Sequence, residues 1–303
     1  MANANHVSDS PTGMSALLPT TPAAVRAAAF RASADCRDSS QPGVAVAANL
    51  NSATQTVISG HQHVIDAVVA SLKTTGRLRA VKLAVSAPFH SPVLLPAVPE
   101  IMRAIAPGRR LLDAALPPAL LDAAFCHDAW YADFQAQHDS TISLRQLCSF
   151  MGSYFQVGSC KMDEQDDIED DPALASLLRR GAVPVFSNVT AQPHSFGGDD
   201  AALALALQAI APVQWHTTMQ NVLQVAAEAD YMPPNVLLEV GPGNTLTSLA
   251  KQIAKEKGQG STDDPVLCNL DSAKSIASLV RRAEKSAIGL GDVQVWQAGA
   301  QQK

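Results

Sequence analysis

The order of predicted elements between residues 13 and 87 constrains the fold of this 303-residue chain more than any other feature. Apolar segments with a period of two, typical of strands, alternate there with segments of helical period. The segments are strands at 13–19, 43–50, 54–60 and 77–87, and helices at 21–32 and 61–76. This β-α-β-β-α-β order is typical of a ferredoxin-like unit, so we place an α+β subdomain of that kind at residues 13–88.

A second pattern, which begins near residue 182, predicts part of a parallel sheet. Strand-like and helical segments alternate, and such alternation favours a parallel sheet covered on both faces. The segments are VPVFSNVT (183–190), DDAALALALQAI (199–210), the buried-type strand VLLEV (236–240), a turn and helix in GPGNTLTSLAKQIAKEK, and VLCNL (266–270). With a helix predicted at 92–105, we assign residues 89–106 and 182–290 to an α/β core.

Residues 107–181 show no clear period over most of their length, so we predict a partly disordered surface insertion there. The run DEQDDIEDD (163–171) contains seven of the 28 acidic residues, and without it the chain is close to neutral. We interpret that run as a solvated loop, because it lacks the alternation and the glycine of a calcium site. The polar residues 1–12 are predicted to be a disordered N-terminus.

Composition excludes several classes of protein. No stretch approaches the roughly 20 apolar residues of a membrane helix, so no membrane partner is expected. The five cysteines form no C-x-x-C pair, which favours reduced thiols over a disulfide framework or a metal site. No P-loop, dinucleotide fingerprint or basic-aromatic stripe is present, so neither a nucleotide cofactor nor a nucleic-acid partner is predicted.

The stretch VSAPFHSPV (85–93) places a histidine, His90, at the end of an apolar run and between two prolines. A lone histidine in such a place is more often the end of a strand than a catalytic group. The alternative is an imidazole that takes a proton from a serine hydroxyl, which is a poor nucleophile without such a base. The sequence around His90 decides between these two interpretations.

Five blocks of sequence occur in the order found in malonyl-CoA:acyl-carrier-protein transacylases, and the chain resembles the C-terminal portion of that family. The blocks are NLNSATQTVISG (49–60), LAVSAPFHSPVLLPAVPEI (83–101), VPVFSNVTAQP (183–193), PVQWHTTM (212–219) and LLEVGPGNTLTSL (237–249). The resemblance extends over roughly residues 13–105 and 182–272. It implies a ferredoxin-like subdomain inserted into an α/β-hydrolase-like core, in agreement with the element order.

The resemblance also implies a function, the transfer of a malonyl group from malonyl-CoA to an acyl carrier protein, in fatty-acid or polyketide synthesis. His90 would be the general base, and the main-chain carbonyl of Gln214 would orient its imidazole. Phe89 and Asn51 would lie on the substrate side, with Phe89 matching the malonyl-selective form of the motif. Malonyl-CoA is a substrate, so no cofactor is expected.

The serine nucleophile of the family lies in a G-H-S-x-G elbow, and no G-x-S-x-G occurs in this chain. One interpretation is an acyltransferase whose elbow would precede Met1. The alternative is a truncated, non-catalytic protein that binds an acyl carrier protein or an acyl group. Either would be intracellular, cytoplasmic or mitochondrial, with no targeting peptide visible in the chain.

Overall fold

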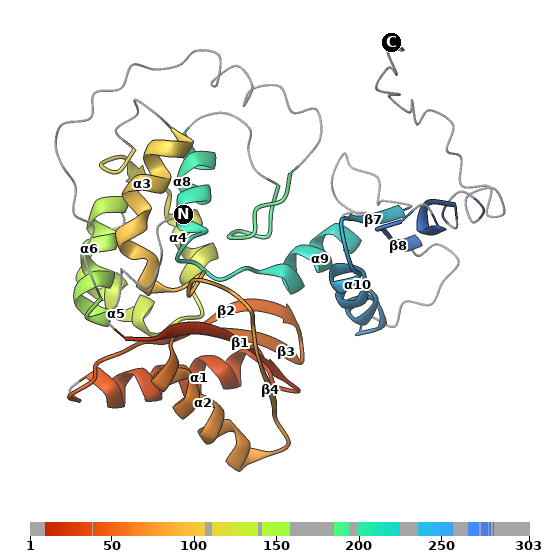
Figure 1. Ribbon diagram of the computed structural model, residues 1–303. Helices are drawn as coiled ribbons and strands as arrows, with labels where there is room; N and C mark the ends of the chain where they lie inside the picture. Colours follow the sequence, from red (N-terminus) through yellow and green to blue (C-terminus); the bar gives the residue numbers. More distant parts are fainter. Residues whose placement is uncertain are drawn as a thin grey trace, which may run out of the picture. The chain divides into compact units, whose positions relative to one another are not determined.

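The computed structural model describes most of the chain, which divides into two units between Asn221 and Val222. The described residues are 10–37, 39–106, 111–138, 141–157, 185–193, 199–224, 236–256, 266–272, 274–277, 279 and 281. Residues 1–9 of the predicted N-terminus and the acidic run at 163–171 lie outside them. The chain is of the mixed α/β class (Figure 1).

The first unit contains a four-stranded sheet with strand order β2-β3-β1-β4, and neighbouring strands are antiparallel. Its elements are β1 (Thr12–Leu18), α1 (Pro22–Arg37), β2 (Ala45–Ser52), β3 (Gln55–His61), α2 (Gln62–Thr75) and β4 (Arg79–Lys82). The predicted order of these six elements is confirmed, although the last strand is shorter than the predicted 77–87. We call residues 12–82 the sheet subdomain.

The two faces of this sheet are buried by different sets of side chains, as the period of two requires. Leu17 and Ile58 belong to the cluster that α1 and α2 cover, together with Val25 and Val64. On the other face, a separate small cluster is made of buried Met14, Ala16, Ala48 and Val57. Figure 1 shows α1 and α2 together on one side of the strands.

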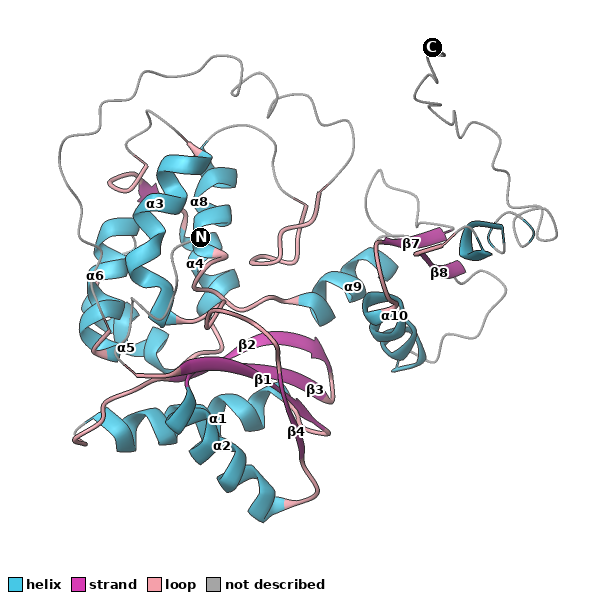
Figure 2. Cartoon of the chain, in the orientation of Figure 1, coloured by secondary structure: helices cyan, strands magenta, loops and turns pink. Residues whose placement is uncertain are grey.

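The remainder of the first unit is largely helical (Figure 2). Its elements are the 3₁₀ helix η2 (Pro92–Ala97), α3 (Val98–Ile105), β5 (Ala115–Leu116), α4 (Pro118–Phe125), α5 (Ala129–Gln137), β6 (Ile142–Ser143), α6 (Leu144–Phe155), α8 (Asp199–Leu207) and the first seven residues of α9 (Trp215–Gln224). We call η2, α3 to α6 and α8 the helical layer. Residues 185–193 form turns with a single bridge between Phe186 and Pro193, so the predicted strand at 183–190 is wrong in its described part.

The prediction of a surface insertion at 107–181 is wrong for residues 111–138 and 141–157. These residues supply α4, α5 and α6 to the largest buried cluster of the protein, and Phe125, Leu144, Leu147 and Met151 are almost completely buried. Helices α4 and α5 have only eight and nine residues, so no clear period was visible in the sequence. Ser143 and Gln146 form a capping box that starts α6.

The second unit contains the parallel pair β7 (Val236–Val240) and β8 (Val266–Leu270), with α10 (Thr245–Glu256) between them in sequence. Both strands and the helix were predicted. Burial of the first strand was not found, because Leu238 is 45% exposed and Val240 is 80% exposed. In the described part of this unit, these strands have too few neighbours to cover both faces of a parallel pair. Among the described helices, none is long and apolar enough to cross a membrane.

Candidate active site around His90

His90 lies in a tight turn whose backbone conformation is uncommon for residues other than glycine. Its φ is 60°, in the left-handed region that side chains other than glycine rarely adopt. The turn is held by the next residue, since the buried Ser91 hydroxyl donates to the carbonyl of Pro88 over 2.6 Å. Such strain costs about 1–3 kcal/mol and is common at functional sites, so the turn fixes the direction of His90.

Two hydrogen bonds attach His90 to the end of helix α8. Its backbone N–H donates to the carbonyl of Ala209 over 3.0 Å, and its ring Nδ1 lies 2.7 Å from the carbonyl of Gln208. A carbonyl only accepts, so Nδ1 carries the proton and Nε2 keeps its lone pair. These carbonyls directly follow the last residue of α8, where a helix leaves carbonyls without partners of its own.

Burial gives this imidazole the properties of a base. Desolvation lowers the pKa of His90 below its ordinary value, and the hydrogen bond to the carbonyl of Gln208 opposes that shift. The neutral ring is therefore favoured at neutral pH, with Nε2 able to accept a proton.

The predicted role of Gln214 as the orienting residue is wrong, because the carbonyl at Nδ1 belongs to Gln208. The carbonyl of Gln214 instead accepts from both the N–H and the hydroxyl of Thr218, each over 2.9 Å. Its side-chain amide donates to the carbonyls of Ala123 and Val189. Gln208 was missed because a main-chain carbonyl leaves no mark in the sequence. The apolar helix that ends just before it was the available signal.

Residues 208–214 bring several of the predicted blocks together. At one end they hold His90, and in the middle Val213 pairs with β2 through bonds to Ala48 and Leu50 of 2.8 and 2.9 Å. Asn51, the residue after Leu50, is half-buried in that strand. At the other end the N–H of Gln214 donates to the carbonyl of Asn188 over 2.9 Å. Four of the five sequence blocks therefore meet along one segment.

Phe89, the other predicted substrate-side residue, is 39% exposed beside His90. Among the described residues, no hydrogen bond joins His90 to a serine hydroxyl. No described group of three or more His, Cys, Asp or Glu side chains is placed to hold a metal ion. The neutral imidazole of His90 can accept a proton at Nε2 from a hydroxyl or thiol placed beside it.

The fifth block forms a tight turn and helix start in the second unit. Gly241 and Gly243 have φ values of 142° and 87°, which explains the glycines of EVGPGNTL. The helix start is capped by Glu239, whose carboxylate accepts from the N–H groups of Leu246 and Thr247 over 3.0 and 2.8 Å. This carboxylate occupies the positive end of α10.

No known protein-family profile matches the sequence, and no curated protein matches it. Solved structures do match, and three of them are similar at TM-scores of 0.52 to 0.54. The malonyl-CoA acyl-carrier-protein transacylase of Coxiella burnetii is 22% identical, and the alignment covers 89% of this chain and 57% of that one. The transacylase of Xanthomonas oryzae pv. oryzae is 23% identical, with coverages of 92% and 60%.

The third structure is a malonyl-transacylase in complex with the acyl-carrier protein of a type II polyketide synthase, 19% identical, with coverages of 92% and 61%. The chain thus spans less than two thirds of the length of these structures. The similarity to these structures shows that this mixed α/β chain has an acyltransferase fold. Within that class, the matched fold is that of the malonyl-CoA acyl-carrier-protein transacylases, as the sequence blocks predicted.

Proposed function

We propose that the chain is the His90-bearing part of a malonyl-CoA:acyl-carrier-protein S-malonyltransferase of fatty-acid or polyketide synthesis. In this proposal the sheet subdomain is the ferredoxin-like unit, and β7 and β8 belong to an α/β-hydrolase-like core. The observation that carries the proposal is the neutral, oriented imidazole of His90 in a transacylase fold. Its Nδ1–H is fixed by Gln208, which leaves Nε2 as the base.

The proposed chemistry is acyl transfer through a serine ester. Nε2 of His90 takes the proton of the serine hydroxyl as its oxygen attacks the malonyl thioester. The C–S bond breaks, and the thiolate of CoA leaves with the proton from the imidazolium. In the second half, the carrier-protein thiol gives its proton to His90, attacks the ester and releases the serine. No residue of this chain matches that serine, so it would come from outside these 303 residues.

A basic surface supports an acyl carrier protein as the partner. Lys73, Arg77, Arg79 and Lys82 are exposed within a short stretch of α2, β4 and the loop between them. Carrier proteins are acidic, and complementary charge speeds the encounter of two proteins. The structure of a similar transacylase with its carrier protein bound gives this partner further support.

The test is transfer of radiolabelled malonyl from malonyl-CoA to a carrier protein. We expect no transfer by the chain alone, and transfer when a polypeptide that carries a G-H-S-x-G elbow is added. In the active mixture, His90→Ala should lower the rate by about two to four orders of magnitude, the usual effect of losing a general base. His127→Ala is the matched control, because His127 is exposed and lies on another turn.

Gln208→Ala provides a second control, since it keeps the main-chain carbonyl and should leave the rate within about threefold. A rate for His90→Ala within threefold of the parent would exclude His90 as the base. A non-catalytic binder of carrier protein or acyl groups is the alternative, raised by the lack of a G-x-S-x-G motif in the sequence. Tight carrier-protein binding without transfer in any mixture would support that alternative.

The pH profile of transfer gives an independent measure of His90. Because desolvation lowers the pKa of His90, the imidazole stays neutral below the ordinary titration range of histidine. We therefore expect the acid limb of kcat/KM to fall below about pH 6.5, the ordinary histidine value. An acid limb above that value would contradict the buried, neutral base.

A further inference from the structure

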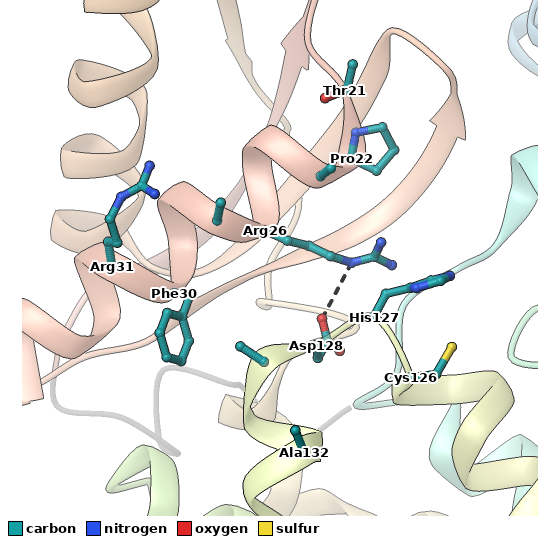
Figure 3. Close-up of a pocket in the computed structure, with 12 residues that line it drawn as sticks. Thr21, Pro22, Arg26, Phe30, Arg31, Cys126, His127, Asp128 and Ala132 are labelled. Atoms are coloured by element: carbon teal, nitrogen blue, oxygen red, sulfur yellow. Dashed lines mark ion pairs between the residues drawn. The ribbon is translucent and has the colours of Figure 1, made fainter.

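A second polar site lies in the first unit, between helix α1 and the turn that joins α4 to α5 (Figure 3). The cleft has a volume of about 810 Å³, which is within the range of small-molecule sites. Its polar lining comes from Thr21, Arg26 and Arg31 on the α1 side and from Cys126, His127 and Asp128 on the turn. His90 is not among its lining residues.

Arg26 is the central group of this cleft and is incompletely satisfied. Its Nε lies 3.5 Å from Oδ1 of Asp128, which is an ion pair but longer than an ordinary N–H···O hydrogen bond. Nε is buried and has no hydrogen-bond partner. Figure 3 shows the guanidinium extending past Asp128 towards His127. A buried donor of this kind gains from an added acceptor, because leaving it unpaired is costly.

The fixed charges of the cleft favour a ligand with one negative charge. Arg26 and Arg31 contribute two positive charges, and Asp128 contributes one negative charge when ionised. In Figure 3 the Arg31 side chain points away from Arg26, so the two cations do not converge on one point. This arrangement suits a single carboxylate on Arg26 better than a phosphate with two charges.

The remaining lining is apolar and offers a surface for a hydrocarbon body. Phe30, which is 44% exposed, and Ala27 line the α1 side, and Ala129 and Ala132 line the α5 side. A smaller cavity of about 40 Å³ shares Arg26, Phe30, Asp128 and Ala129 with the cleft and is also lined by Trp130 and Phe155. That volume accommodates little more than one water molecule or a methyl group.

We propose that this cleft binds a small monocarboxylate with an apolar body, its carboxylate on the guanidinium of Arg26 and its body against Phe30 and the alanines. Arginine suits this role because its planar fork can donate two parallel hydrogen bonds to one carboxylate. The site is separate from His90 and goes beyond acyl transfer.

Asp128 makes binding at this site depend on pH. Desolvation raises the pKa of Asp128 to about 6, although Arg26 acts to lower it. Below that pH the aspartic acid no longer competes for Arg26 and can donate a hydrogen bond to the ligand. Binding should therefore tighten as the pH falls from 8 to 5.5. The other charged or titratable groups that line the two cavities are Arg31, Arg37, Cys126, His127 and Tyr154.

The experiment is calorimetric titration of the full chain with hexanoate, compared with hexanol, hexylamine and hexyl phosphate. We expect hexanoate to bind more tightly than the other three probes. Arg26→Gln, made together with Asp128→Asn so that no buried carboxylate loses its partner, should weaken binding by about tenfold to a hundredfold. Asp128→Asn alone should abolish the change between pH 8 and 5.5, whereas His127→Gln should preserve it.

A matched pair on α5 tests the place of binding without altering charge. Ala132→Trp should fill the cleft and abolish binding, whereas Ala136→Trp, one turn further along the same exposed side of the helix, should leave it unchanged. Equal binding of hexanol, tighter binding of hexyl phosphate, or equal effects of the two tryptophan variants would each overturn the proposal. So would hexanoate binding that survives in the Arg26→Gln, Asp128→Asn variant.

Discussion

The sheet subdomain and the helical layer each contain fully buried side chains, but these side chains come from the chain in different ways. The buried cluster beneath the sheet draws only on residues between Leu17 and Leu72. The cluster of the helical layer runs from Ala87 to Ala211 and joins helices that are far apart in sequence, such as α3 and α8. The first core is local, and the second depends on distant segments meeting.

The two cores therefore differ in how much of the chain each one needs in order to fold. A local core can form from one continuous stretch with a regular hydrophobic pattern, so it needs little from the remainder of the chain. The helical layer forms only when all of its helices are present, since each is short and buries one side against the others. His90 follows the sheet subdomain and is held by the end of α8, so its geometry depends on the second kind of core.

The largest expected effect comes from replacing residues 111–157 with a Gly/Ser linker. This change removes α4, α5 and α6 and several fully buried side chains, each of which contributes about 1.5–3 kcal/mol. The sum exceeds the stability of an ordinary domain, about 5–15 kcal/mol, so the helical layer should not fold. Thermal unfolding followed by circular dichroism would measure the loss, and amide exchange would show whether the sheet subdomain persists.

An unchanged melting temperature would contradict this expectation and would restore the interpretation of the segment as a surface insertion. Loss of protection in both regions at once would instead show that the sheet subdomain depends on the helical layer.

Two leucines with the same burial allow the cores to be compared side by side. Leu17 in β1 and Leu147 in α6 are both 0% exposed. Replacement of either by alanine should lower the free energy of unfolding by about 2–5 kcal/mol, measured by denaturant titration. If the cores are independent, the double variant should lose the sum of the two values to within about 0.5 kcal/mol.

Leu205→Ala is the control for this pair, since Leu205 lies on α8 but is 40% exposed. It should cost less than about 1 kcal/mol. If the Leu17→Ala, Leu147→Ala double variant loses much less free energy of unfolding than the sum of the two single losses, the two clusters form one cooperative core.

The sheet subdomain could be predicted from the sequence because its pattern is local. Strands with a period of two alternate with two helices long enough to show their period, and Gly76 ends the second helix. The helical layer could not be predicted in the same way. Helices α4 and α5 have eight and nine residues, about two turns each, which is too short for a clear period. The capping residues Ser143 and Gln146 were the overlooked signal of α6.

In the candidate site, too, some features could be predicted from the sequence and others could not. His90 could be predicted because its side chain and its neighbours form a block with a recognisable spacing. The partner of His90 is a main-chain carbonyl at the end of α8, and only the folded chain brings that carbonyl to Nδ1. The cleft at Arg26 was not predicted at all, since five of its twelve lining residues come from the segment that showed no pattern.

The ion pair of Arg26 and Asp128 links the two regions, and its pH dependence gives a third prediction. The folded state keeps the proton of Asp128 up to about pH 6, whereas the unfolded state releases it near 3.8. The stability from this group is therefore present below about pH 4 and is lost as the pH rises to about 6. Asp128→Asn should remove this slope and raise the free energy of unfolding at pH 7 by about 1–3 kcal/mol.

Urea titrations of both proteins at pH 4, 5, 6 and 7 would measure this effect. Asp113→Asn is a suitable control, because that carboxylate is 58% exposed. Parallel stability curves for the parent and Asp128→Asn would show that the link between the sheet subdomain and the helical layer is insensitive to protonation.

The smallest effect is expected at the surface of the helical layer, where Arg145 meets Asp113. The two side chains form paired hydrogen bonds of 2.5 and 2.9 Å, yet they are 45% and 58% exposed. Water and salt screen such a pair, so its coupling energy should be only about 0.2–1 kcal/mol despite the good geometry. A double-mutant cycle with Arg145→Ala and Asp113→Ala, repeated in 1 M salt, would isolate that energy. A coupling above about 2 kcal/mol that survives salt would mean that surface charge, as well as packing, holds the distant segments of the helical layer together.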